Sequence, residues 1–163
     1  MKKSIIAIAL LSAIMLTGCG GSDEAVEANA TVSTAAEITA GGITGAITAE
    51  IEIPSAMEKT AENIGAYYDI DPATVAEMSV FICGSGAYPD ELAVFRFNDA
   101  ESASTGAEAV KSRLENQIAI YRDYTPAEMY KLDEAVIITE GNWVAFAACA
   151  DNARAKEIIE SLI

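Results

Sequence analysis

The sequence TGAEAVKSRLENQIAIY, residues 105–121, carries the strongest periodic pattern of the chain. Apolar or aromatic residues recur in it every three or four positions, at Ala107, Val110, Leu114, Ile118 and Tyr121. This spacing places them on one face of an α-helix. Thr105 and Glu108 match the capping-box pattern at a helix start. The segment therefore predicts the central helix of a folded domain.

Short runs rich in β-branched and aromatic residues lie on both sides of this helix, bounded by turn-forming residues. They predict four strands, over residues 78–83, 92–97, 135–139 and 143–149. Gly84, Ser85 and Gly86, followed by Pro89 and Asp90, separate the first two strands, and residues 140–142 separate the second two. Each pair of strands is therefore expected to form an antiparallel hairpin.

Further helix starts are marked by capping residues. Ser55 with Glu58 and Thr125 with Glu128 match the capping box, and Asp151 can cap a last helix that runs to the C-terminus. The predicted order is helix, strand, strand, helix, strand, strand, helix. It indicates an α+β domain, a four-stranded, mainly antiparallel sheet with helices packed on one face.

The N-terminus has the pattern of an export signal. Lys2 and Lys3 precede an apolar run over residues 5–15, which is shorter than the roughly 20 residues needed to span a bilayer. We therefore expect a signal peptide over residues 1–18, removed from the mature protein.

The end of this signal resembles the bacterial lipoprotein signal, in which Leu, a small residue and Gly precede an invariant Cys. The matching residues are Leu16, Thr17, Gly18 and Cys19. The resemblance implies that Cys19 becomes the first mature residue and carries acyl chains, two or more of which anchor a protein stably in a bilayer. The expected location is the outer face of the cell membrane. The alternative is an ordinary signal peptide with an incidental Cys.

The chain after Cys19 is rich in Gly, Ser, Thr, Ala and Glu and contains no aromatic residue up to about residue 53. This composition predicts a flexible tether over residues 19–53. The alternative for part of this segment is a strand, because residues 38–40, 43–45 and 47–49 form a small repeat. The remaining residues, 54–163, are enough for one globular domain.

The composition excludes some classes of function. The net charge is −15, and removal of Lys2 and Lys3 leaves eight basic residues against twenty-five acidic ones, or −17. Such a surface repels nucleic acid. The chain has no histidine, the commonest metal ligand and general base. We therefore expect neither enzymatic activity nor a cofactor.

Three segments carry a resemblance to a known family. They are residues 90–95 (Asp-Glu-Leu-Ala-Val-Phe), residues 121–124 (Tyr-Arg-Asp-Tyr) before Pro126, and residues 136–139 leading into Gly141-Asn142-Trp143-Val144. Over roughly residues 55–163 the chain resembles the small bacterial lipoproteins catalogued as domain of unknown function 4358. The resemblance implies a lipid-anchored extracytoplasmic domain without assigned activity, so it identifies no catalytic residue.

Cys83 and Cys149 would lie outside the cytosol after export, where disulfides persist. They can form a disulfide if their strands are neighbours; otherwise they are two buried thiols. Asp69 and Asp71, with Glu77 beyond, offer oxygens to a hard cation, but the calcium-loop pattern lacks its further ligands and central Gly. No metal site is therefore predicted.

Aromatic residues supply a candidate recognition patch, because they are enriched at binding hot spots. Its members are Tyr121, Tyr124, Tyr130 and Trp143, and a carbohydrate, a peptide or an envelope protein would suit it. The sequence thus favours a lipid-anchored, non-catalytic binding or accessory domain of the bacterial envelope, whose partner is an envelope protein or wall component. A small-ligand or cation-binding lipoprotein serving a transporter remains the alternative, and a hydrolase with paired carboxylates is a third hypothesis.

Overall fold

Five antiparallel strands form the central sheet in the computed structural model, which describes residues 37–163. They are β1 (Ala56–Lys59), β2 (Val75–Cys83), β3 (Glu91–Phe97), β4 (Val136–Glu140) and β5 (Trp143–Ala148), in the spatial order β1-β2-β3-β5-β4. Both predicted hairpins are present, because β2 pairs with β3 and β4 pairs with β5. The α+β class is confirmed, although the sheet has five strands rather than four.

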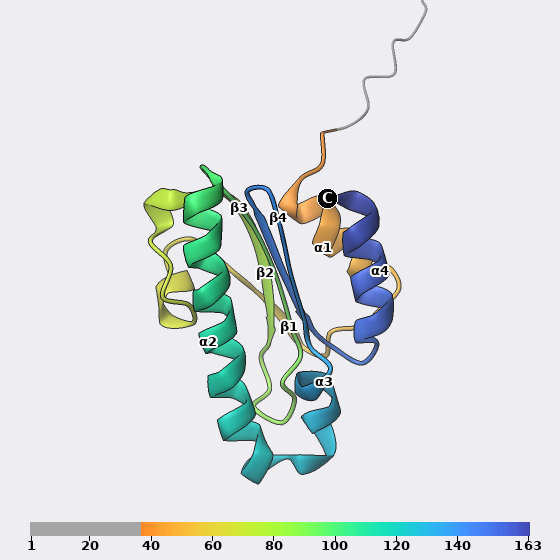
Figure 1. The fold of residues 1–163 in the computed structure, drawn as a ribbon. Helices are drawn as coiled ribbons and strands as arrows, with labels where there is room; N and C mark the ends of the chain where they lie inside the picture. Colours follow the sequence, from red (N-terminus) through yellow and green to blue (C-terminus); the bar gives the residue numbers. More distant parts are fainter. Residues whose placement is uncertain (1–36) are drawn as a thin grey trace, which may run out of the picture. The chain divides into compact units, whose positions relative to one another are not determined.

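Helices cover both faces of this sheet (Figure 1). The long helix α2 (Ala100–Tyr124) lies on one face, and α1 (Ala40–Thr48) and α4 (Asn152–Leu162) lie together on the other. The short helix α3 (Met129–Asp133) connects α2 to β4. The prediction that the helices pack on one face is therefore wrong.

The two-sided packing follows from the composition of the central strands, which are apolar at nearly every position. Ala93, Phe95 and Phe97 of β3 face α2, and their neighbours Leu92 and Val94 face α1 and α4. Successive side chains of a strand point to opposite faces, so an uninterrupted apolar run needs cover on both. The domain accordingly has two hydrophobic cores, one on each side of the sheet.

The fifth strand, β1, lies where the sequence predicts a helix beginning at Ser55. Ala56 to Lys59 pair with Cys83 to Val80 of β2, and Ser55 has a left-handed backbone (φ 49°) instead of a helix-capping one. The capping pattern is local, whereas the free edge of β2 is 20 or more residues away in sequence. Pairing with this edge satisfies the backbone of both strands, and that outweighs the local preference.

Helix α1 lies within the segment predicted to be a flexible tether. Thr39 caps it, and Ala40, Ile43 and Ile47 are completely buried against the sheet. The Thr44 hydroxyl also makes a buried 2.7 Å hydrogen bond to Ser79 of β2. The tether prediction is therefore wrong for residues 40–53, and the folded domain begins before residue 54. The predicted signal peptide and residues 19–36 of the predicted tether lie outside the described residues.

The central helix is longer than the apolar pattern predicts. It begins at Ala100, where the Asp99 carboxylate accepts a hydrogen bond from the backbone N–H of Ser102. Thr105, the predicted cap, lies inside the helix and donates its hydroxyl to the Glu101 carbonyl. Asp151 does cap α4, where it accepts from the N–H of Arg154.

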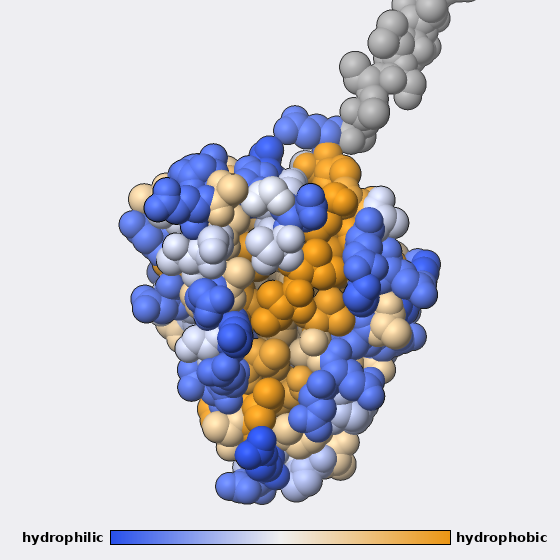
Figure 2. All heavy atoms as spheres, in the orientation of Figure 1, coloured by the Kyte–Doolittle hydropathy of each residue, from blue (hydrophilic) through white to orange (hydrophobic). Residues whose placement is uncertain are grey.

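The edge strand β4 contributes to the apolar surface of the molecule. Figure 2 shows a hydrophobic band between α2 and α4, where β4 forms the edge of the sheet and Val136, Ile137 and Ile138 are half-buried.

Among residues 37–163, no helix is long and apolar enough to cross a bilayer.

Gly106 sets how closely α2 approaches the sheet, since a Cβ atom at this position would overlap the buried ring of Phe97. We expect Gly106→Ala to destabilise the domain, because overpacking costs about 1–3 kcal/mol and exceeds the gain in helix propensity of about 1 kcal/mol. Gly45→Ala in α1 is the matched control, since nothing lies within 4 Å of its added methyl group. Urea unfolding should show loss of stability for the first variant and a gain for the second; equal gains would contradict this packing.

Candidate binding groove

The Asp90-Glu91 pair at the start of β3 directs two buried carboxylates to different helices. The Glu91 side chain is completely buried and lies on the α2 face. The Asp90 side chain is also completely buried and binds Lys131 of α3. Both belong to the 90–95 segment that the sequence analysis singled out, although their ionic partners were not predicted.

Glu91 gathers hydrogen bonds from three side chains. Arg113 donates from Nη2 at 2.8 Å and from Nε at 3.2 Å, while Gln117 Nε2 and the Tyr68 hydroxyl donate as well. Burial and the negative charge of Glu91 raise the pKa of Tyr68 well above its ordinary value, so this hydroxyl remains a donor. The group fixes the middle of α2 on the sheet.

Asp90 and Glu128 hold the Lys131 ammonium at 2.7 and 2.8 Å. Burial lowers the pKa of Lys131, but the hydrogen bonds to the two carboxylates outweigh this effect and raise it above its ordinary value. The ammonium also lies 5.3 Å from the centre of the Tyr88 ring, within the range of a cation–π interaction. This ion pair attaches α3 to the loop between β2 and β3.

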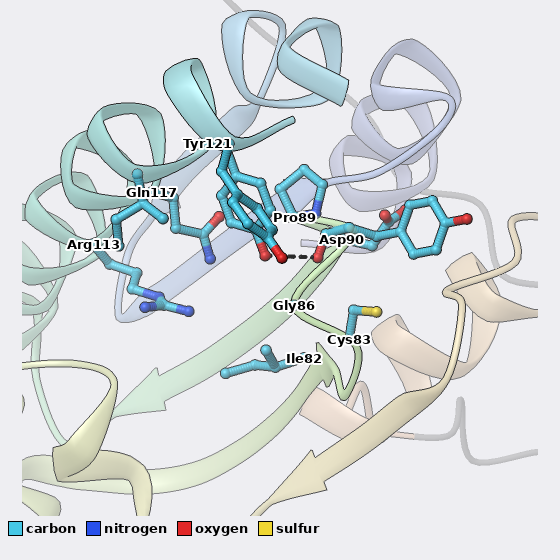
Figure 3. Close-up of a pocket in the computed structure, with 11 residues that line it drawn as sticks. Ile82, Cys83, Gly86, Pro89, Asp90, Arg113, Gln117 and Tyr121 are labelled. Atoms are coloured by element: carbon cyan, nitrogen blue, oxygen red, sulfur yellow. Dashed lines mark hydrogen bonds between the residues drawn. The ribbon is translucent and has the colours of Figure 1, made fainter. Parts of the chain in front are cut away.

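Between that loop and the C-terminal half of α2 lies a cavity of about 390 Å³ (Figure 3). We call it the tyrosine groove, because Tyr88, Tyr121 and Tyr124 line it together with Ile120. Tyr88, Ile120 and Tyr124 are 41%, 60% and 69% exposed, which is unusual for large apolar or aromatic side chains gathered at one site. Ile82 of β2 and Gln117 of α2 line its inner part.

Tyr121 connects the two walls of the groove. Its hydroxyl donates a 2.9 Å hydrogen bond to the Tyr88 carbonyl, drawn as the dashed line in Figure 3. Partial burial raises the pKa of Tyr121, so the hydroxyl stays protonated and the bond persists at neutral pH. The hairpin loop is thereby held against the helix.

Two buried acceptors of groove-lining residues, Asp90 Oδ1 and the amide oxygen of Gln117, have no hydrogen-bond partner among the described residues. The Nε2 of Gln117 faces Glu91, because a carboxylate only accepts hydrogen bonds, and this fixes the orientation of the amide. Figure 3 shows the amide oxygen turned toward Tyr121, away from the guanidinium of Arg113.

The predicted recognition patch is divided in the structure. Tyr121 and Tyr124 line the groove, whereas Tyr130 is exposed outside it, on α3. Trp143 belongs to the α1 and α4 side of the sheet and stacks near Arg96, with its ring centre 5.5 Å from the guanidinium. It lies at the opposite end of β5 from Ala148, which pairs with Glu91. The structure adds Tyr88 to the groove.

Sequence reasoning missed Arg113 and Gln117. The two residues are one helical turn apart, and Tyr121 follows after another turn. The available signal was that these two polar residues lie four positions apart at the border of the predicted apolar face.

Cys83 and Cys149 are free, buried thiols. A disulfide would require the strands of the two cysteines to be neighbours, but β3 lies between β2 and β5. Cys83 and Cys149 lie on opposite sides of Asp90, at the start of β3. Two strand spacings put their Cα atoms roughly 10 Å apart, beyond the reach of a disulfide. Burial raises the pKa of the Cys149 thiol, which makes it unreactive.

A second cavity, of about 270 Å³, is lined by Asp69 and Asp71 together with Asp99 and Glu101. Two of these carboxylates already serve the backbone, since Asp71 accepts from Ala73 N–H and Asp99 from Ser102 N–H. Glu77 lies elsewhere and accepts from the N–H of Ala40. Within residues 37–163, no three Asp, Glu or Cys side chains are arranged to hold a metal ion.

The family model described as a domain of unknown function (DUF4358) matches residues 49–149. The chain belongs to this family. In this DUF4358 protein the matched part contains all five strands, α2, α3 and the tyrosine groove, while α1 and α4 lie outside it. No curated protein and no solved structure matches the chain significantly. Residues 16–19, with the predicted lipid-attachment Cys19, lie outside the described residues.

Arg113 neutralises the buried Glu91 and also lines the groove. We expect Arg113→Met to destabilise the domain by about 3 kcal/mol, because it leaves an uncompensated buried charge. Adding Glu91→Gln to this variant should recover part of the loss. Arg122→Met, an exposed position on the same helix, is the control and should be nearly neutral. Urea unfolding measures all three; equal effects at positions 113 and 122 would show that Glu91 does not depend on Arg113.

Proposed function

We propose that this DUF4358 protein is a lipid-anchored, non-catalytic binding domain at the outer face of the cytoplasmic membrane, and that it recognises an envelope component through the tyrosine groove. The observation that carries the proposal is the exposed aromatic rim around a cavity whose buried Gln117 oxygen has no partner within residues 37–163. Binding sites combine such apolar walls with a few placed polar groups.

The charged groups around the groove support binding rather than catalysis. Glu91 is bound by Arg113, and Asp90 is bound by Lys131, so each carboxylate is neutralised by a fixed cation. The Cys83 thiol is engaged with the backbone of Ser85, at 3.4 Å from both its N–H and its carbonyl. A general base or nucleophile needs a group that is free to exchange a proton with the substrate.

The membrane location is supported by the Leu16-Thr17-Gly18-Cys19 sequence behind an apolar run. Seventeen residues separate Cys19 from residue 37, where the described domain begins. At no more than about 3.5 Å per residue, they allow at most about 60 Å between anchor and domain. The groove would therefore work within a short distance of the membrane surface.

The anchor is tested by intact-mass spectrometry of the native protein from the membrane fraction. We expect a mature species that begins at Cys19 and carries the mass of two or more acyl chains. Cys19→Ser should abolish this species, because the thiol that forms the thioether is gone. If the protein with the native Cys19 were found in the medium without acyl chains, the predicted anchor would be contradicted.

The groove is tested by placing a photo-crosslinking amino acid at position 124 of the membrane-bound protein. We expect a specific adduct with an envelope component, because Tyr124 is the most exposed residue of the rim. Position 130 is the matched control, since Tyr130 is an exposed tyrosine that does not line the groove. Identical adducts at both positions, or none at position 124, would overturn the groove as the recognition site.

A further inference from the structure

The unpaired oxygen of Gln117 calls for a hydrogen-bond donor. The residue is only 3% exposed, and its oxygen has no partner among residues 37–163. A buried acceptor without a partner costs free energy, which a ligand that supplies an N–H or O–H donor recovers. Tyr121 lies next to this oxygen in Figure 3 and is only partly buried, so a ligand reaches the oxygen by displacing this ring and breaking its hydrogen bond to the Tyr88 carbonyl.

Arg113 supplies a donor beside that acceptor. Its Nε and Nη2 bind Glu91, while Nη1 makes no hydrogen bond to any described residue. Because Glu91 neutralises the guanidinium, the pair favours an uncharged ligand group. Arg113 and Gln117 lie one helical turn apart on α2 and both line the groove, so it contains one donor and one acceptor without a partner among the described residues. A secondary amide, with one C=O and one N–H, is complementary to this pair.

The rest of the groove suits a compact ring. Tyr124 and Tyr88 are exposed at its rim, and Ile82 and Pro89 supply apolar contacts. Aromatic faces of this kind pack against the C–H face of a sugar through apolar contact. The volume of about 390 Å³ lies near the small end of the range of ligand sites, roughly 300–1,000 Å³.

We propose that the tyrosine groove binds an N-acetylated amino sugar, with the acetamido group between Arg113 and Gln117 and the sugar ring against Tyr124. The proposal rests on the function proposed above and names the class of its ligand. A wall glycan carrying such sugars is chemically suited to an acidic protein, because a neutral sugar is not repelled by a net charge of −15.

A peptide is less well suited to the groove. One common way to bind an extended peptide is to add it as a strand to a free sheet edge. At the groove, β2 lies between β1 and β3, and β3 lies between β2 and β5, so the backbones of both strands are already paired. The groove therefore offers side-chain hydrogen bonds to one amide rather than a series of backbone bonds to several.

The test is calorimetric titration of the full-length protein in detergent micelles with N-acetylglucosamine. A ligand of this size should bind with a Kd on the order of millimolar. Glucose, which lacks the acetamido group, should bind at least about tenfold more weakly. Tyr124→Ala should weaken N-acetylglucosamine binding about tenfold, whereas Tyr130→Ala should leave it unchanged. Both residues are exposed, so neither variant should impair folding.

Three results would overturn the proposal: no saturable binding of N-acetylglucosamine, equal binding of glucose, or equal weakening by the two tyrosine variants. N-acetylalanine methylamide serves as the peptide probe, and binding as tight as that of the sugar would assign the groove to a peptide. If the sugar fails while the crosslink at position 124 persists, only the ligand class is wrong. If both fail, the proposed function fails as well.

Discussion

A carboxylate that is completely removed from solvent has to be matched by donors from its surroundings, and Glu91 imposes this requirement on the domain. Its partners come from three places: the segment before β2 supplies Tyr68, and two successive turns of α2 supply Arg113 and Gln117. This polar interaction fixes the middle of the long helix on the sheet, and the close contact of Gly106 with Phe97 sets its distance nearer the start. The same interaction orients the Gln117 amide and leaves its oxygen unpaired, so the constraint that positions the helix also creates the polar part of the groove.

Elements with strong local patterns were predictable. The hairpins of β2 with β3 and of β4 with β5 were found because β-branched runs and turn residues alternate within a few positions, and α2 was found from its apolar face. Elements defined by distant partners were not. The Ala56–Lys59 strand depends on the free edge of β2, and α1 depends on the apolar positions Leu92 and Val94, which call for cover on a second face.

The residues of the candidate site show the same difference between local patterns and distant partners. Tyr121 and Tyr124 were identified because aromatic residues, which are enriched at binding hot spots, flank a predicted loop there, and both line the groove. Trp143 was grouped with them, but the alternation of side chains along β5 directs it to the other face. The cysteine pairing depended on which strands are neighbours, and strand order is not encoded in any short segment. Arg113 acquires its role only beside Glu91, twenty-two residues earlier in the chain.

The contact between the first and last helices has a consequence for the order of folding. α1 packs on α4, and Arg154 binds Glu50 across 104 residues of sequence. The core on this side of the sheet therefore cannot close until the C-terminal helix is available, and bringing such distant segments together slows folding. A chain that crosses the membrane N-terminus first would expose the apolar faces of α1, Leu92 and Val94 until its last dozen residues have emerged. Under the proposed export, the interval between the arrival of α1 and that of α4 would be the period in which the chain most needs protection from aggregation.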